Sequence, residues 1–172
     1  MGKIRQCQPV KLFIGFIFRE EPFFEKAKQT LENKFGKIDF ESSTFPFSHT
    51  DYYQKEFGVH LKRKFISFKR LIPPDKLAKI KNQTNRIEQK LAQNQKRSVN
   101  LDPGYLNFSK VVLASTKDYG HRIYLRWGIY TEITLLYQNK AFHPLVWTYP
   151  DYRTGEYLDV FQKIREIYAK QL

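Results

Sequence analysis

The order in which strand-like and helix-like segments alternate is the feature that most constrains the fold. Strand-like segments are short apolar runs, whereas helix-like segments repeat apolar residues every three or four positions. Strands are expected at residues 10–18, 38–45, 61–72 and 96–101, and helices at residues 22–35 and 77–91. The resulting order, β-α-β-β-α-β, predicts an α+β fold whose residues 1–105 form a split βαβ, or ferredoxin-like, core.

The remaining residues, 106–172, are expected to extend this core. Asp102-Pro103-Gly104 is typical of a turn, and residues 108–116, with Val111 and Val112 facing inward, suggest a short helix. Antiparallel strands are expected at residues 121–127, 129–137 and 141–147, followed by a closing helix marked by Tyr157, Phe161, Ile164 and Tyr168. The chain contains no Gly/Ser-rich linker and no long repeat, so we expect one domain over residues 1–172.

Composition indicates a folded protein of a reducing compartment. The 172 residues are 41% hydrophobic and 16% aromatic, which is enough to build a core. The single cysteine, Cys7, excludes an internal disulfide and suits the cytoplasm. The apolar run at residues 10–18 ends at Arg19-Glu20-Glu21 instead of a cleavage site, and no run approaches the roughly 20 residues of a membrane span. We therefore expect a cytoplasmic protein without membrane segments.

The positive charge is concentrated in one part of the chain. Residues 55–97 hold 13 basic and 3 acidic side chains, so this segment contributes +10 of the formal net charge of +13. A field concentrated in this way attracts polyanions, whereas an even distribution would mainly affect solubility.

Two elements in this segment share the imbalance. On the expected helix, a wheel at about 100° per residue puts the basic side chains opposite the apolar stripe. On the preceding strand, basic residues share one face with Ile66 and Phe68 between them. Lysine or arginine beside an exposed aromatic ring suits single-stranded nucleic acid, but Ile66 and Phe68 could equally be core residues in a solvated strand. The candidate polyanion-binding residues are Lys62, Lys64, Arg70, Lys79, Arg86 and Lys90.

Polar and aromatic residues also cluster in the expected loops. His49 lies two residues before Asp51, and Asp118 three residues before His121. A histidine oriented by a carboxylate can act as a general base, although Asp in such loops more often caps a turn. These four residues are the candidate catalytic residues. Glu132 would need a partner if its strand face is buried, and Arg122 or Arg126 could supply a structural ion pair.

Several common sites are missing from the sequence. It contains no G-x-x-x-x-G-K-[ST] segment and no G-x-G-x-x-G after the first strand, which argues against a P-loop hydrolase or a dinucleotide-binding fold. No spacing matches a metal-ligand signature, and no cofactor is expected.

Several segments together resemble a prokaryotic family known as domain of unknown function 4416. They are Lys11-Leu12-Phe13-Ile14-Gly15, Phe45-Pro46-Phe47, Val99-Asn100-Leu101-Asp102-Pro103-Gly104, His121-Arg122-Ile123-Tyr124-Leu125 and Trp147-Thr148-Tyr149-Pro150-Asp151-Tyr152. The resemblance covers nearly the whole chain and implies a compact bacterial or archaeal protein. It implies no particular activity or catalytic residue.

The sequence supports three hypotheses of different kinds. The first is a module that binds RNA, a nucleotide or another polyanion through the basic segment. The second is a hydrolase, acid–base or metal-assisted, that uses the His/Asp loops. The third is a protein-interaction module whose basic face docks on an acidic partner. Whether the chain is an enzyme is left open.

Overall fold

The computed structural model describes residues 2–48 and 59–172. Its first half consists of β1 (Val10–Phe18), α1 (Glu21–Phe35), β2 (Ile38–Glu41), β3 (Phe45–Phe47), β4 (Leu61–Ile72) and α3 (Leu77–Lys90). Its second half consists of β5 (Val99–Leu106), β6 (Lys110–Ser115), β7 (Ile123–Arg126), β8 (Ile129–Gln138), β9 (Ala141–Pro144) and α4 (Gly155–Ala169). Short 3-10 turns, Pro74–Lys76 and Asp151–Arg153, precede α3 and α4.

The strands in the described part of the chain form one nine-stranded sheet with α+β architecture. The order along the sheet is β2-β4-β1-β5-β6-β8-β7, with β3 paired to β4 and β9 paired to β8. Every pair of neighbouring strands is antiparallel. Strands from the two halves of the sequence therefore belong to the same sheet.

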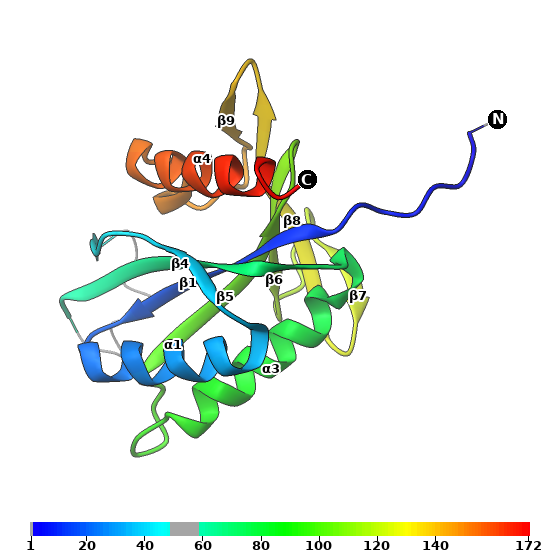
Figure 1. Cartoon of the computed structure of the whole chain (residues 1–172). Coiled ribbons are helices and arrows are strands. Elements are labelled where there is room, and N and C mark those ends of the chain that lie inside the picture. Colours follow the sequence, from blue (N-terminus) through cyan, green and yellow to red (C-terminus); the bar gives the residue numbers. More distant parts are fainter. Residues whose placement is uncertain (1, 49–58) are drawn as a thin grey trace.

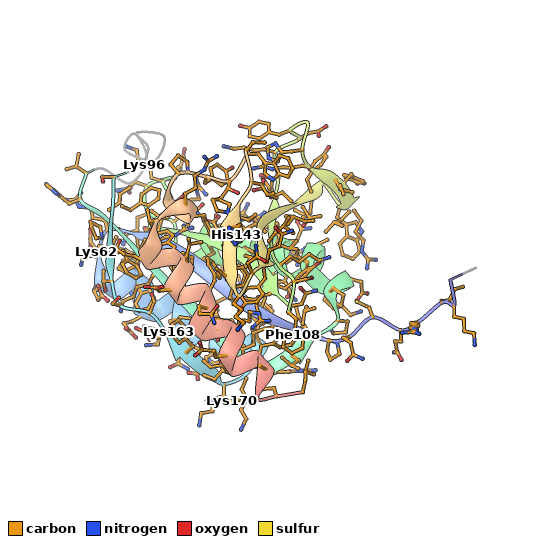
Figure 2. All side chains as sticks on the ribbon, turned by 90° about the horizontal axis from the view of Figure 1, so that it is seen from above. Lys62, Lys96, Phe108, His143, Lys163 and Lys170 are labelled. Atoms are coloured by element: carbon orange, nitrogen blue, oxygen red, sulfur yellow. The ribbon has the colours of Figure 1, made fainter. Side chains whose placement is uncertain are left out.

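Helices cover both faces of this sheet (Figure 1). On one face, α1 and α3 bury Phe16, Ile66 and Phe68 together with the other even-numbered apolar residues of β1. On the opposite face, α4 packs against Phe13 and Phe65, which alternate with them along the strands. Because β1 is covered on both sides, its sequence is an unbroken apolar run. Figure 2, seen from the α4 side, shows α4 lying across the sheet.

The first half of the chain largely has the predicted elements. The strands expected at residues 10–18 and 61–72 have those bounds, and the helices expected at residues 22–35 and 77–91 differ by one residue at an end. The strand expected at residues 38–45 is instead two short strands, β2 and β3. Both pair with β4, and Pro46 lies inside β3.

The helix predicted at residues 108–116 is wrong, because this segment forms strand β6. Four consecutive residues, Val111 to Ala114, are buried. Val111 and Leu113 face the α4 side, whereas Val112 and Ala114 face α3. A strand between two neighbours buries side chains on both faces, so β6 has the two-residue period that a helix cannot satisfy.

The turn predicted at Asp102-Pro103-Gly104 is also wrong. These residues continue β5 beside β1, so the strand runs from Val99 to Leu106 instead of ending at residue 101. Gly104 is required by close packing: a Cβ there would lie 2.4 Å from the Val112 carbonyl oxygen and 2.5 Å from Phe13 Cζ. The glycine therefore allows close approach within the sheet and does not mark a bend.

The sheet splits between β5 and β6, and we call this split the fork. The two strands pair only through Gly104–Leu106 of β5 and Val111–Leu113 of β6. Before Gly104, β5 stays beside β1; after Leu113, β6 stays beside β8. Helix α3 contacts β5, β6 and β8 and so spans the two arms of the fork.

Across residues 2–48 and 59–172, every helix is too short or too polar to cross a lipid bilayer.

Candidate functional site

A pocket of about 650 Å³ lies in the fork. Both arms line it, with α3 on one side and the Tyr149–Tyr152 segment on the other. Small-molecule sites commonly have volumes of about 300–1,000 Å³, so the pocket has the size of a ligand site. Its wall is strongly polar and includes Arg63, Lys81, Glu88, Asn100, Asp102 and Arg122.

Arg63, from β4, is a buried cation of this wall and is only 1% exposed. Its Nη1 donates to Asp102 Oδ2 at 3.0 Å, and its Nη2 donates to the Tyr152 hydroxyl at 2.7 Å. Asp151 Oδ2 lies 3.7 Å from the same Nη2. The guanidinium also lies over aromatic rings, with its Cζ 4.9 Å from the Phe65 ring centroid and 5.2 Å from that of Tyr152. Charge pairing and cation–π contacts thus offset the cost of burial.

Asp102 is held in its charged form by this arrangement. Burial favours the neutral acid, but Arg63 and Lys81 outweigh it and lower the pKa of Asp102. The Asn100 amide adds to the lowering, although its Nδ2 makes no hydrogen bond of ordinary geometry. The pocket therefore presents a carboxylate at neutral pH.

Side chains from α3 take the place of a neighbouring strand along β5. Glu88 Oε1 accepts a hydrogen bond from the Leu101 N–H at 2.7 Å, and Lys81 Nζ donates to the Leu101 carbonyl at 2.8 Å. Burial raises the pKa of Glu88, and Lys81 and the Leu101 N–H offset part of the rise. Because β6 has diverged, these two side chains satisfy main-chain groups that would otherwise be buried unpaired.

Two buried donors of the pocket wall make no hydrogen bond of ordinary geometry within the described part of the chain. They are Arg63 Nε and Asn100 Nδ2. Arg97 Nη1 donates to Asn100 Oδ1 at 2.9 Å, and arginine can only donate, so this contact fixes the amide with Nδ2 turned away from Arg97. An unpaired buried donor costs about 1–3 kcal/mol.

A second ion-pair cluster borders the pocket at β8. Arg122 Nε donates to Glu132 Oε2 at 2.7 Å, which confirms the structural ion pair expected from the sequence. Arg122 Nη2 also donates to the Tyr149 hydroxyl at 2.7 Å. Burial raises the pKa of Tyr149, and Arg122 offsets part of this effect. His121 Nε2 lies 3.1 Å from Glu132 Oε2, and the imidazole stacks on Trp147 with 5.4 Å between ring centroids.

The predicted catalytic residues are not brought together by the described structure. His49 and Asp51 lie outside the described residues. His121 faces Glu132 instead of Asp118. Asp118 is exposed beside Tyr130, whose pKa is raised by partial desolvation and by this carboxylate. Neither Asp118 nor His121 lines the pocket, so their catalytic role stays a prediction. Within residues 2–48 and 59–172, no three His, Cys, Asp or Glu side chains are grouped so that they could hold a metal ion.

The predicted polyanion-binding residues fall into two groups. On β4, Lys62 and Lys64 both lie 3.4 Å from Glu21, and Lys64 also pairs with Glu41 at 2.9 Å. Phe68 is fully buried, so the interpretation of it as an exposed stacking ring is wrong. The remaining candidates are exposed: Arg70 near the end of β4, and Lys79, Arg86 and Lys90 on α3. Figure 2 shows Lys62 to one side of α4.

Sequence reasoning did not identify Arg63, Lys81 or Asp102 as site residues. A signal was present for Arg63, because it falls between Leu61 and Phe65 on the apolar face of its strand. A charge in such a position needs buried partners. The partners of Arg63 come from β5 and the segment before α4, so they could be found only from the tertiary structure.

Over residues 8–168 the chain matches a family described as Domain of unknown function (DUF4416), which confirms the resemblance seen in the sequence. No curated protein matches the chain, and no solved structure does.

Proposed function

The chain belongs to this family of unknown function, and we propose that it binds a small oxygen-rich anion, a carboxylate or a phosphate, in the fork pocket. The observation that carries the proposal is the pair of buried, unpaired donors, Arg63 Nε and Asn100 Nδ2, in the wall of one pocket. Both are donors, so the complementary ligand supplies acceptors.

The charges of the pocket support an anion over a cation. Arg63, Lys81, Arg97, Lys117 and Arg122 line it, against Glu88, Asp102, Glu132 and Asp151. The excess is a single positive charge, which favours a ligand of low negative charge. Because most of these groups are already held in ion pairs, the wall is organised before a ligand arrives, and little ordering cost is added on binding.

A thermal-shift screen with carboxylates, sugar phosphates and nucleotides tests the proposal. A ligand at about 100 times its dissociation constant stabilises the fold by about 2.7 kcal/mol. For a chain of this length that corresponds to a rise of roughly 5–10 °C in Tm. Binding would then be measured by titration calorimetry.

Asn100→Asp is the decisive variant. It keeps the oxygen that accepts from Arg97, removes the free donor and adds a negative charge, so affinity should fall at least about tenfold. Asn33→Asp makes the same change of charge on the exposed face of α1, where the oxygen that accepts from Gln29 is kept. Equal affinity in the two variants would contradict the proposed site.

A second candidate function is binding of RNA or another polyanion to the outer face of α3. Lys79, Arg86 and Lys90 are exposed there, and none is within ion-pair distance of a described acidic side chain. Neutralising them in Lys79→Gln/Arg86→Gln/Lys90→Gln should weaken binding of a short single-stranded RNA. A plot of the logarithm of the RNA-binding constant against the logarithm of the salt concentration should also become less steep. Its slope should change by about 0.7 for each phosphate that the variant no longer neutralises.

The matched control removes three exposed cations elsewhere, in Lys140→Gln/Lys163→Gln/Lys170→Gln. If RNA affinity is independent of salt, or falls equally in both triple variants, the α3 face is not the binding surface.

The hydrolase hypothesis has one observation in its favour. The Glu132 carboxylate orients His121, as a general base requires, and Glu132 also lines the pocket. A phosphatase or esterase activity that is lost in His121→Asn and kept in His143→Asn would support it.

We infer a ferredoxin-like core within residues 1–105; the strand order β2-β4-β1-β5 and the placement of α1 and α3 on one face support it. A cytoplasmic location rests on the single cysteine.

A further inference from the structure

Exposed apolar side chains gather along the β7 edge of the sheet. They are Ile123, Tyr124, Leu125, Trp127, Ile133, Val146 and Trp147, which we call the edge strip. β7 is the last strand of the sheet in the described part of the chain, and all four of its residues are exposed. Figure 1 shows β7 at the rim of the sheet, away from α4.

The residues of the strip follow the outer side of β8. β7 pairs with β8 at Ile129–Thr131, and β9 pairs with it at residues 135–138. Ile133 lies between these two paired regions. The Trp147 side chain is joined to β8 at this point, because its Nε1 donates to the Ile133 carbonyl at 2.8 Å. The apolar residues of the hairpin and of the 145–147 loop therefore lie along one edge.

The area of the strip is that of a protein interface. Its residues are between 37% and 87% exposed. Since a large side chain has roughly 150–250 Å² to bury, these fractions correspond to an area on the order of 800 Å². Monomers rarely expose contiguous apolar patches beyond about 600 Å², and a stable dimer buries about 800 Å² on each partner.

Charge favours a neutral partner over a nucleic acid at this edge. The seven residues of the strip carry no charge, and Arg126, which lies between Leu125 and Trp127, is shared between Asp75, at 4.0 Å, and the ring of Trp127. The excess positive charge of the chain is contributed by residues 55–97, and none of the seven residues of the strip belongs to that segment. The strip therefore suits an uncharged partner surface, such as the same strip on a second copy.

We propose that the edge strip is a homodimer interface, in which two copies pack β7 edge to β7 edge about a twofold axis. A twofold contact is self-complementary, so one apolar strip on each copy is sufficient to close the assembly. This inference is independent of the pocket and of any ligand.

The test uses the full chain in sedimentation velocity from about 1 to about 100 µM, where mass action drives association. The mass should rise from monomer to dimer over this range. The only two tryptophans of the chain, Trp127 and Trp147, both lie in the strip at 59% and 38% exposure. Their emission should therefore shift to shorter wavelength as the dimer forms.

Ile123→Lys/Val146→Lys should weaken dimerisation at least about tenfold, because it buries two charges at the interface. Val59→Lys/Leu172→Lys is the matched control, since both residues are exposed, at 55% and 57%, and lie outside the strip. Circular dichroism checks that both variants are folded. A monomer at every concentration, or equal dimerisation of the two variants, overturns the proposal. So does a monomer whose tryptophan emission shifts only when RNA is added.

Discussion

Replacing Arg63 with methionine should destabilise the protein strongly. The substitution keeps much of the side-chain volume but removes the guanidinium that lies 3.0 Å from Asp102 and 3.7 Å from Asp151. Arg63 is 1% exposed, so water cannot replace its guanidinium as the partner of these two carboxylates. Removing one partner of a buried ion pair costs about 3–5 kcal/mol, which for a chain of this length lowers Tm by roughly 10 °C.

Urea unfolding followed by circular dichroism measures this loss. Adding Asp102→Asn to Arg63→Met removes the carboxylate that has lost its arginine partner. The double variant should therefore be more stable than Arg63→Met alone. The coupling between the two sites should be about 1–3 kcal/mol. If Arg63→Met costs less than about 1 kcal/mol, the buried guanidinium is not what stabilises this region.

The pH dependence gives an independent check with a defined sign. In the wild type the pKa of Asp102 is lowered, so its contribution is present above the unfolded value near 3.8 and is lost as the pH falls through the folded pKa. Without Arg63, burial raises the pKa of this carboxyl. Protonation at lower pH then removes the unpaired buried charge, so the variant is less destabilised. The stability difference between the wild type and Arg63→Met should therefore shrink from pH 7 towards pH 4. A difference that stays constant over this range would refute the electrostatic argument.

Two further predictions concern the arms of the fork. Glu88→Gln should remove one contribution to the pH dependence of stability. Because burial raises the pKa of Glu88, the wild type should gain stability relative to the variant as the pH falls from 7 towards 4.5. Urea melts over this range test this, and parallel pH profiles of the two proteins would contradict it. Gly104→Ala should cost about 1–3 kcal/mol by overpacking against Val112 and Phe13, whereas Gly155→Ala, with no atom within 4 Å of the added Cβ, should melt close to the wild type.

The elements that the sequence predicted correctly are those whose surroundings leave a local pattern. β1 and β4 have long apolar stretches, and α3 has a regular stripe that faces the sheet. β6 has an apolar run of only four residues, Val111 to Ala114, which does not by itself distinguish a strand from a helix, and its burial on both faces depends on β5 and β8 as neighbours. Pro103 and Gly104 suggested a turn because their roles within β5 depend on the close approach of Phe13 and Val112.

The pocket could not be predicted for a related reason. Arg63, Asp102 and Asp151 lie far apart in the sequence and meet only because the sheet order places β4, β1 and β5 side by side. Glu132 was different, since a buried acid on a strand face requires a cation and Arg122 on the preceding segment was a near candidate. Short-range pairing was therefore predictable, whereas convergence at the fork was not.

The fork also determines how the two parts of the sheet are mechanically connected. Main-chain hydrogen bonds join β5 to β6 over three residues only, so the connection at the open end depends on α3 and its side chains. A molecule bound between the arms would contact both of them and hold them together. Occupancy should then slow amide hydrogen exchange in Val99–Leu106 and Lys110–Ser115 together, although the two strands pair only through Gly104–Leu106 and Val111–Leu113.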